Sequence, residues 1–317
     1  MGHYRHLTTD ERESTMALRS QGLSLRAIAR KLKRSPATIS REVRRNSKAD
    51  GQYSSDYAAK RYCKRRKHCC PKRIMENPDL AQLVADKLRM KWSPEQIAGR
   101  LALEKYPVRF SYATIYRAID QHVLPHSLKK ELRFKSKYKR HKDDDRRGKR
   151  DGVTSISERP EAVNNRSEVG HWESDTVLGK RKTGRIGTHV DRKTGLLVAF
   201  KLAGGTPEEF AAATIAAFSA FPLAARRSFT VDRGFEFARY EWITEKLCMP
   251  VFFCDPYSPW QRGTNENTNG LLRQFFPKKT SFAPITDEAL AHVVALINSR
   301  PRKRFGWKSP QEVFSSA

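Results

Sequence analysis

The chain has 317 residues, of which 38% are hydrophobic, and its 62 Lys and Arg outnumber its 34 Asp and Glu to give a formal net charge of +28. This length suits two or three domains with modest cores. The positive charge predicts binding to a polyanion, with nucleic acid as the expected partner. A membrane surface is the rival polyanion, but the sequence has no long apolar segment and no signal-like start. The five cysteines are an odd number, which argues against a secreted disulfide framework. We therefore expect a cytoplasmic protein that does not bind membranes.

Residues 1–48 have the pattern of a helix-turn-helix domain. The segment Thr9–Gln21 has helical spacing, with Met16 expected to face inward. Ser24 and Ser35 are suitable N-cap residues for the two helices that follow, and Pro36 suits the first position of the second. The outward face of this last helix is expected to meet bases and phosphates in the DNA major groove. Its candidate DNA-binding residues are Thr38, Ser40, Arg41, Arg44 and Arg45.

Part of this pattern recurs, which predicts a second helix-turn-helix-like domain at residues 75–122. Ser-x-x-x-Ile-Ala-x-x-Leu begins at Ser24 and again at Ser93, and Ser-x-Ala-Thr-Ile-x-Arg begins at Ser35 and again at Ser111. Ser93 and Gln96 also form a capping-box pair. Two ordinary amphipathic helix pairs are the alternative. The outward positions include Tyr112, Tyr116 and Asp120 beside the candidate DNA-binding residues Thr114 and Arg117, so this domain contacts either DNA or a neighbouring protomer.

Two basic segments, residues 49–74 and 123–157, are predicted to be linkers that follow the phosphate backbone without reading sequence. The first contains Cys63, His68, Cys69 and Cys70. Because adjacent cysteines point in divergent directions and no second pair lies nearby, reduced thiols are expected there rather than zinc. The second contains Asp143–Asp145, which have no framework to hold a metal.

Residues 158–317 have the pattern of an α/β domain with a mixed five-stranded sheet. Hydrophobic runs at 171–178, 186–190 and 196–202, separated by turn-like segments, predict an antiparallel meander. Thr206, Pro207 and Glu209 predict a helix that begins with a capping box. A strand that ends at Asp232, a helix over 236–247, a strand at 251–253 and a helix from about Thr264 follow.

Three carboxylates in this domain lie within or at the ends of predicted strands and helices. Asp175 lies in the first strand, Asp232 ends the fourth, and Glu266 lies at the start of the helix after the fifth. Converging carboxylates bind hard divalent cations, and two such ions promote in-line phosphoryl displacement. Taken singly, acids at strand ends are most often solvated turn residues.

The segments GHWESD (170–175), VDRGFEF (231–237) and PYSPWQRGTNEN (256–267) resemble the three acidic blocks of the IS-thirty family of bacterial DDE transposases. The resemblance covers nearly the whole chain. It implies an RNase H-like core of the retroviral integrase type. It also implies that Asp175, Asp232 and Glu266 are the catalytic residues and hold two Mg²⁺ ions. Mn²⁺ would be able to substitute for Mg²⁺.

The resemblance further implies a transposase that binds the terminal inverted repeats of its insertion sequence. Such an enzyme cleaves DNA by hydrolysis and joins the 3′-hydroxyl to target DNA by transesterification, as a dimer or larger homo-oligomer on DNA. In the cytoplasm of a bacterium it would be associated with the nucleoid. The alternative is a catalytically inactive DNA-binding regulator that retains the fold; its one argument is Arg233, where such blocks commonly have Asn. A retroviral-type integrase would share the chemistry but not the tandem N-terminal units.

Further residues near the acids are candidates for supporting roles. Glu173 shares a strand face with Asp175, so it either supports the metal ligands or is a surface acid. Asp191 and Asp255 are weaker carboxylate candidates, and Trp260 either packs as a lid or stacks on a base. The candidate phosphate contacts are Arg233, Arg273, Lys278 and Lys279, with solvated surface cations as the alternative.

Overall fold

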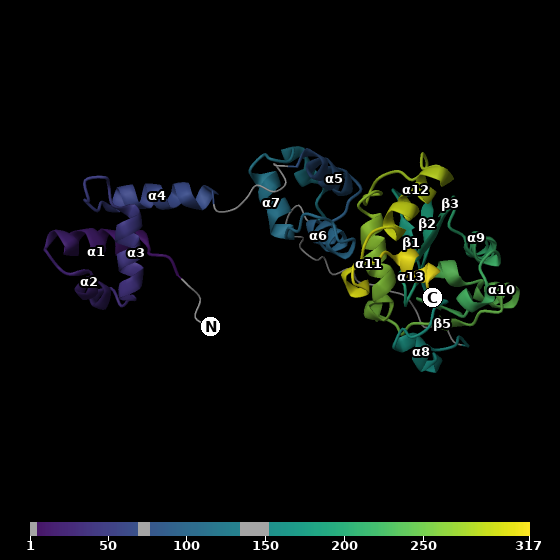
Figure 1. Ribbon diagram of the computed structural model, residues 1–317. Helices are drawn as coiled ribbons and strands as arrows, with labels where there is room; N and C mark the ends of the chain where they lie inside the picture. Colours follow the sequence, from purple (N-terminus) through teal and green to yellow (C-terminus); the bar gives the residue numbers. More distant parts are fainter. Residues whose placement is uncertain (1–4, 69–76, 134–151) are drawn as a thin grey trace. The chain divides into compact units, whose positions relative to one another are not determined.

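The computed structural model describes residues 5–68, 77–133 and 152–317 (Figure 1). The chain divides into two compact units, Met1–Arg73 and Ile74–Ala317. None of the described helices is long and apolar enough to cross a bilayer. Cys63 is an exposed free thiol; Cys69, Cys70 and Asp143–Asp145 lie outside the described residues.

The first unit contains the helices α1 (Thr9–Ser20), α2 (Leu25–Lys31), α3 (Pro36–Asn46) and α4 (Ser55–His68). The predicted cap is present, because Ser24 Oγ accepts from the Ala27 N–H over 3.3 Å. Ile28, Ala29, Ile39 and Val43 form the core between α2 and α3. Ser35 occupies the N-cap position of α3, but its side chain makes no cap hydrogen bond there, so Pro36 at the first position and the apolar stripe set the start of this helix.

Two details of the first unit differ from expectation. Met16 is 38% exposed, and the buried residues of α1 are Arg12 and Thr15. Arg12 is accommodated because its Nε donates to Glu42 Oε1 over 2.9 Å. The segment 55–68, predicted to belong to a linker, is helix α4, which packs against α1 and α3. Burial of Tyr53 and Ala58 in the same core holds it there.

The second unit begins with α5 (Pro78–Arg89), α6 (Pro94–Leu103), α7 (Tyr112–Asp120) and the 3₁₀ helix η1 (His126–Glu131). The predicted capping box is formed, with Ser93 and Gln96 bonded in both directions. Ile97 and Ile115, which correspond to Ile28 and Ile39 in the repeat, are fully buried. Residues 124–131, predicted as part of a linker, are instead packed into this helical core through Leu124 and Leu128.

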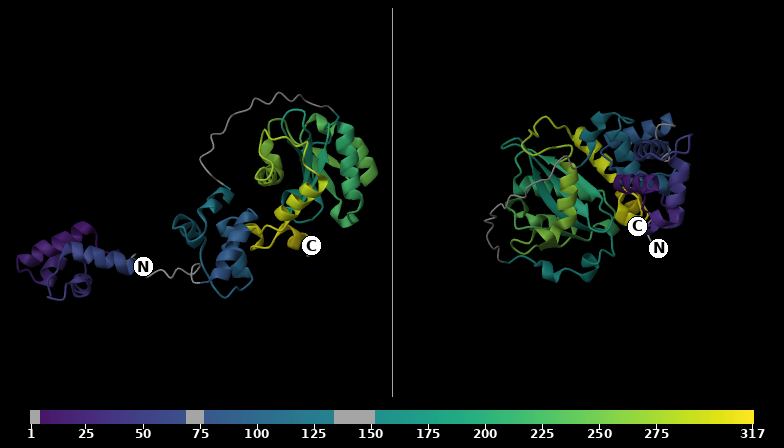
Figure 2. Two further views of the ribbon diagram at one scale, coloured as in Figure 1. Left: turned by 90° about the horizontal axis from the view of Figure 1, so that it is seen from above. Right: turned by 90° about the vertical axis from the view of Figure 1, so that its left-hand side faces the viewer.

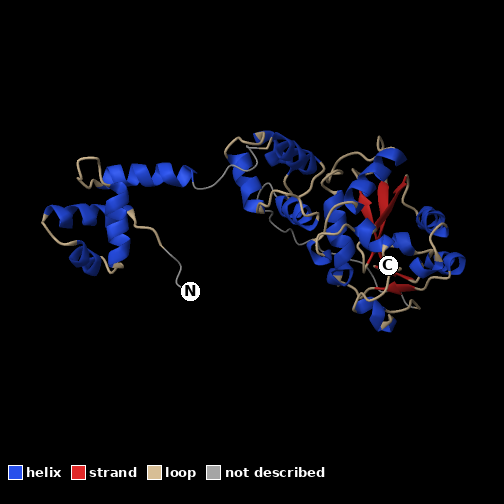
Figure 3. Ribbon diagram, viewed as in Figure 1, coloured by secondary structure: helices blue, strands red, loops and turns tan. Residues whose placement is uncertain are grey.

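A mixed five-stranded sheet forms the centre of the remaining residues (Figure 3). Its strands are β1 (His171–Leu178), β2 (Arg185–Asp191), β3 (Leu197–Leu202), β4 (Ser228–Val231) and β5 (Val251–Phe253), in the order β3-β2-β1-β4-β5. The first three are antiparallel, and β4 and β5 run parallel to β1. The predicted meander and the mixed α/β sheet are confirmed, and this is the RNase H-like arrangement.

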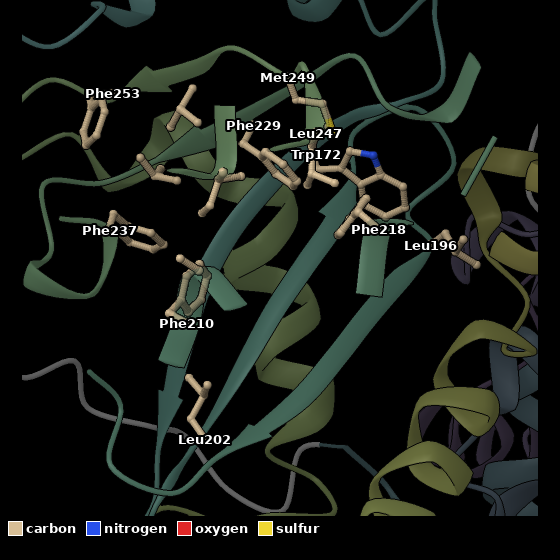
Figure 4. Close-up of a cluster of buried hydrophobic side chains, with 14 residues drawn as sticks. Trp172, Leu196, Leu202, Phe210, Phe218, Phe229, Phe237, Leu247, Met249 and Phe253 are labelled. Atoms are coloured by element: carbon tan, nitrogen blue, oxygen red, sulfur yellow. The ribbon is translucent and has the colours of Figure 1, made fainter. Parts of the chain in front are cut away.

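Helices cover both faces of the sheet. On one face, α9 (Pro207–Ser219) and α10 (Tyr240–Leu247) enclose an aromatic core in which the rings of Trp172 and Phe218 meet edge to face at 4.9 Å (Figure 4). On the other, α11 (Gly263–Leu272) and α12 (Asp287–Asn298) enclose a second core with Val177 and Ile186. Since side chains alternate along β1, Trp172 and Ser174 face the first core, whereas Glu173, Asp175 and Val177 face α11.

Of two predicted helix starts, one needs correction. Thr206 Oγ1 accepts from the Glu209 N–H over 3.2 Å as a cap should. The Glu209 carboxylate also reaches back beyond Thr206 and accepts from the N–H groups of residues 203–205. Against the effect of burial, these N–H groups and that of Thr206 lower the pKa of Glu209. The helix expected over 236–247 begins as the 3₁₀ helix η4 (Phe235–Phe237), and α10 itself starts at Tyr240.

The end of the chain packs against α6 (Figure 2). This tail contains the 3₁₀ helix η6 (Lys303–Phe305) and α13 (Pro310–Ser315). Arg100 pairs with both carboxylate oxygens of Glu312 over 2.6 and 2.7 Å, and the Trp307 indole lies so close to Gly99 that a Cβ there would meet it at 2.2 Å. The remaining short elements are η2 (Ile156–Glu158), α8 (Glu161–Asn164), η3 (Leu223–Ala225) and η5 (Pro259–Arg262).

Candidate active site

Asp175 and Asp232 lie side by side on neighbouring strands. The parallel pairing of β1 with β4 sets Glu173 opposite Thr230. Asp175 lies two residues after Glu173 in β1, and Asp232 lies two residues after Thr230, directly after the end of β4. The strand register thus brings together two carboxylates that are 57 positions apart in the chain.

Arg262, at the end of η5, bridges these two aspartates. Its Nη2 donates to Asp232 Oδ2 over 2.7 Å, and its Nη1 lies 3.3 Å from Asp175 Oδ1. Nη1 also donates to the Ser174 carbonyl over 2.9 Å. Burial raises the pKa of Asp175, against the opposing effect of the Arg262 charge. Burial works against the Arg262 charge too, yet the two aspartates raise the pKa of Arg262.

Helix α11 is fixed on β1 by two asparagines. The backbone N–H of Asn265 donates to Glu173 Oε2 over 2.8 Å, and its side-chain Nδ2 donates to the Glu173 carbonyl over 2.7 Å. One turn later, Asn269 Nδ2 donates to Asp175 Oδ2 over 3.0 Å. Glu266, which lies between these two contacts, is exposed. The helix therefore presents Glu266 in the turn that contacts Asp175.

The sequence left open whether Glu173 is a surface acid, and the structure shows that it is not. It is fully buried and ion-paired with Arg192, whose Nε is held by the Val163 carbonyl over 2.9 Å. Because its carboxylate also receives the Asn265 N–H, Glu173 links β1 to the start of α11. It supports the helix that bears Glu266.

The two aspartates suit a bound cation, because both already converge on one, the Arg262 guanidinium. Glu266 has no recorded contact with either of them. Across the described ranges, no three His, Cys, Asp or Glu side chains are grouped so as to hold a metal ion. The Arg262 guanidinium lies between the two aspartate carboxylates. Asp175 and Asp232 fit a divalent cation, provided that Arg262 moves away.

The other sequence candidates near the acids have diverse surroundings. Arg233 Nε donates to the Cys254 carbonyl at the end of β5 over 3.2 Å. The Arg273 guanidinium lies 5.8 Å from the Phe282 ring centroid, and burial lowers its pKa although Asp175 opposes this. Lys278 and Lys279 are exposed in the loop after α11, and Trp260 is 73% exposed.

Asp191 and Asp255 have structural partners instead. The buried Asp191 accepts from the Gly170 N–H over 2.8 Å, and from both the N–H and the hydroxyl of Thr194 over 2.7 Å. Asp255 accepts from the side chain of Gln261 over 2.8 Å and is exposed. Asp191 therefore stabilises the turn between β2 and β3.

The candidate DNA-binding residues lie on equivalent helices of the two repeats. In α3, Ser40, Arg41, Arg44 and Arg45 are exposed and Thr38 is half-buried; in α7, Arg117 is exposed and Thr114 is half-buried. Arg41 Nε donates to the Ala37 carbonyl over 3.1 Å, and Arg117 Nε donates to the Ala113 carbonyl over 3.3 Å. The repeat is thus preserved down to the side-chain conformation of this arginine.

Sequence reasoning missed Arg262, Asn265 and Asn269. The one available signal was the spacing of Asn269, three residues after Glu266, which makes the two neighbours on a helix surface. That spacing does not reveal which carboxylates the three missed residues meet.

An RNase H-like sheet with paired aspartates on adjacent strands, preceded by helix-turn-helix units, defines an enzyme of phosphoryl transfer on DNA.

Comparisons with known proteins identify the family. Residues 3–46 match a helix-turn-helix domain family. Transposase InsI for insertion sequence element IS30C of Escherichia coli (strain K12) is 42% identical over 97% of this chain and 83% of its own length. The transposase for insertion sequence element IS1086 of Cupriavidus metallidurans is 36% identical over 98% of this chain and 95% of its own.

Two solved structures share part of the fold. The catalytic core domain of BIV integrase is 19% identical, with a TM-score of 0.36, and covers 46% of this chain and 94% of that domain. A chain of the simian T-cell lymphotropic virus intasome is 21% identical, with a TM-score of 0.40, and covers 47% of this chain and 55% of that one.

The chain belongs to the IS30 family of insertion-sequence transposases. It is a transposase of the DDE type, an enzyme that cleaves DNA and transfers its strands. The resemblance found in the three acidic blocks is confirmed. Nothing in these relatives favours the alternative of an inactive regulator.

Proposed function

We propose that Asp175, Asp232 and Glu266 are the catalytic residues of this transposase and hold two Mg²⁺ ions, for which Mn²⁺ can substitute. The observation that supports this is the convergence of Asp175 and Asp232 on one cation at matching positions of adjacent strands. Bound Mg²⁺ supplies activation of the attacking oxygen and stabilisation of the leaving one. Glu266 completes the ligand set from the turn of α11 that Asn265 and Asn269 fix on β1.

Arg262 has a second position in this proposal. A divalent cation held by Asp175 and Asp232 would repel the guanidinium, and Arg262 would then leave both carboxylates. Since Arg262 directly precedes α11, its side chain stays beside the site and pairs bidentately with a phosphate of the DNA strand. Arg262 therefore holds the aspartates together before the ions bind and helps to orient the strand afterwards.

The helical units select the DNA. We assign recognition of the terminal inverted repeats to α3 of residues 1–48, through Thr38, Ser40, Arg41, Arg44 and Arg45, with α7 as a second contact through Thr114 and Arg117. Arg233, Arg273, Lys278 and Lys279 bind phosphates near the acids. Transposition requires two element ends held together, so the protein acts as a dimer or larger homo-oligomer on DNA, in the cytoplasm and at the nucleoid.

The proposed metal ligands are tested by removing charge while keeping shape. Asp175→Asn, Asp232→Asn and Glu266→Gln should each abolish Mg²⁺-dependent cleavage of end DNA and leave binding to that DNA nearly unchanged. Asp255→Asn is the matched control, since Asp255 is an exposed acid on a nearby loop, and it should cleave normally. Substantial cleavage by any of the three variants would remove that residue from the ligand set.

A further inference from the structure

A cluster of three arginines, Arg133, Arg300 and Arg302, lies beside α11 and is not part of the active site described above. Arg133 belongs to the segment after η1, and Arg300 and Arg302 follow α12. Arg133 is exposed, Arg302 is half-buried and Arg300 is only 2% exposed. The arginine cluster therefore runs from the surface into the protein.

Arg300 has donors without acceptors. Its Nη1 donates to Gln274 Oε1 over 3.1 Å. Its Nε and Nη2 are buried and have no hydrogen-bond partner among the described residues, and the same holds for Gln274 Nε2. A buried charged donor without an acceptor is strongly unfavourable. Three such N–H-bearing nitrogens on two side chains that touch each other point to an anionic ligand.

Arg302 and Arg133 each donate to an uncharged acceptor. Arg302 Nη2 donates to the Ile297 carbonyl, and Arg133 Nη2 donates to Asn267 Oδ1, both over 3.3 Å. No ion pair joins Arg300 or Arg302 to a carboxylate in the described part of the chain. Burial first, then the charges of Arg302 and Arg133, lower the pKa of Arg300 to about 9. Each of the three charges thus raises the energy of the others.

The position of the cluster suits a DNA strand. Arg133 contacts Asn267 on α11, and Arg300 contacts Gln274 in the turn directly after this helix. Glu266 is adjacent to Asn267 on the same helix. The cluster therefore contacts the stretch of chain that directly follows Glu266, so DNA bound at Glu266 lies near it.

We propose that Arg133, Arg300 and Arg302 form a binding site for a backbone phosphate of the DNA that enters the active site. The phosphate supplies the acceptors that the buried nitrogens of Arg300 and Gln274 lack, and its charge relieves the repulsion among the three guanidinium groups. The inference rests on the proposed function only in that DNA reaches Glu266; it does not depend on which residues bind metal.

The test uses the full chain in EDTA, so that its outcome is independent of metal binding and cleavage. Arg302→Gln and Arg300→Met are compared with Lys246→Gln, which removes an exposed charge from α10 on the other side of the sheet. Affinity for duplex DNA is measured by fluorescence anisotropy over a range of salt concentrations, and thermal unfolding is followed without DNA.

Arg302→Gln should weaken DNA binding and lower the slope of log K against log salt by about 0.9, the value for one lost phosphate contact, relative to Lys246→Gln. Arg300→Met should also weaken DNA binding, yet raise the unfolding temperature of the free protein, because it removes an uncompensated buried charge. If Arg300 served only to stabilise the fold, Arg300→Met would instead lower the unfolding temperature of the free protein. If DNA affinity and salt slope of Arg302→Gln match the control, the proposal is wrong.

Inorganic phosphate is the second probe. If phosphate stabilises the wild-type protein and Arg302→Gln abolishes that stabilisation without any change in DNA binding, the site takes free anions and the assignment to DNA is overturned.

Discussion

Arg262 donates to Asp232 over 2.7 Å, so the position expected for a metal ion is taken by a side chain of the protein itself. The same guanidinium lies 3.3 Å from Asp175. Two adjacent carboxylates repel each other, and a bridging cation offsets that repulsion. The relationship makes Arg262 both a stabiliser of the free protein and a competitor of the metal.

Removal of Arg262 should therefore tighten metal binding in the absence of DNA. For Arg262→Gln we expect about a tenfold lower dissociation constant for Mn²⁺, equivalent to about 1.4 kcal/mol, together with a lower unfolding temperature of the metal-free protein. Isothermal titration calorimetry and thermal unfolding measure the two effects. Arg239→Gln is the control, since it removes an exposed arginine that pairs with Glu208. Equal Mn²⁺ affinities for wild type and Arg262→Gln would contradict the competition.

Arg233→Asn, which introduces the residue more usual at this position of such blocks, separates two roles of Arg233. If Arg233 binds a phosphate, the variant should lower DNA affinity and leave the Mg²⁺ requirement of cleavage unchanged, and this is the outcome we expect. If Arg233 approaches the ions, the variant should need less Mg²⁺. A magnesium titration of cleavage, with parallel measurements of DNA binding, distinguishes the two roles. A lower Mg²⁺ midpoint for Arg233→Asn at unchanged DNA affinity would contradict the phosphate role.

Arg41→Ala should reduce discrimination between end DNA and scrambled DNA by about 1–3 kcal/mol if Arg41 contacts a base edge. If Arg41 contacts only phosphate, both affinities should fall alike. Arg117→Ala is the matched variant, because Arg117 makes the equivalent contact in α7. Gel-shift titrations at one fixed salt concentration measure the difference. Equal loss in both arginine variants would assign sequence recognition to both repeats.

Glu173→Gln should destabilise the second unit by about 3–5 kcal/mol, because it leaves the buried Arg192 without its counter-charge. Glu241→Gln, at an exposed position of α10, should change stability little. The double variant Glu173→Gln/Arg192→Met should recover part of the loss, as a double-mutant cycle by urea unfolding would show. A loss below about 1 kcal/mol for Glu173→Gln alone would mean that the pair contributes no more than a surface ion pair.

His189 should make stability dependent on pH. Burial lowers its pKa in the folded protein to about 3, and it contacts Ser174 and Thr214 as a neutral ring. As the pH falls below about 6.5, the unfolded chain binds a proton that the folded protein does not, so stability is full above pH 6.5 and is lost towards pH 3. Between pH 7 and pH 5 the loss should be about 2 kcal/mol.

Urea unfolding at pH 7 and pH 5, followed by tryptophan fluorescence, measures this loss. His189→Gln should be less stable at pH 7 but less sensitive to pH. If wild type and His189→Gln lose equal stability between the two pH values, another group is responsible.

The sequence by itself determined the five strands, the helices that begin after Ser24 and Ser93, and the positions of the three acids relative to the strands. The apolar runs of β1, β2 and β3 are bounded by turn residues, and Ser24 and Ser93 cap helices through bonds to residues three positions away. Such features depend on neighbours within a few residues, which a linear pattern records. The position of Asp232 at a strand end is equally local.

Only the tertiary structure decided the contacts between distant segments. Arg262 lies 87 positions from Asp175 in the chain, and the parallel register of β1 and β4 is what makes one guanidinium reach two carboxylates. Burial of Arg12 instead of Met16 in α1 depends on Glu42 from another helix. Likewise, Arg133 and Arg300 come near each other because one contacts α11 and the other contacts the turn directly after it. Charges act through space, so their partners follow from the folded chain and not from the spacing of residues along it.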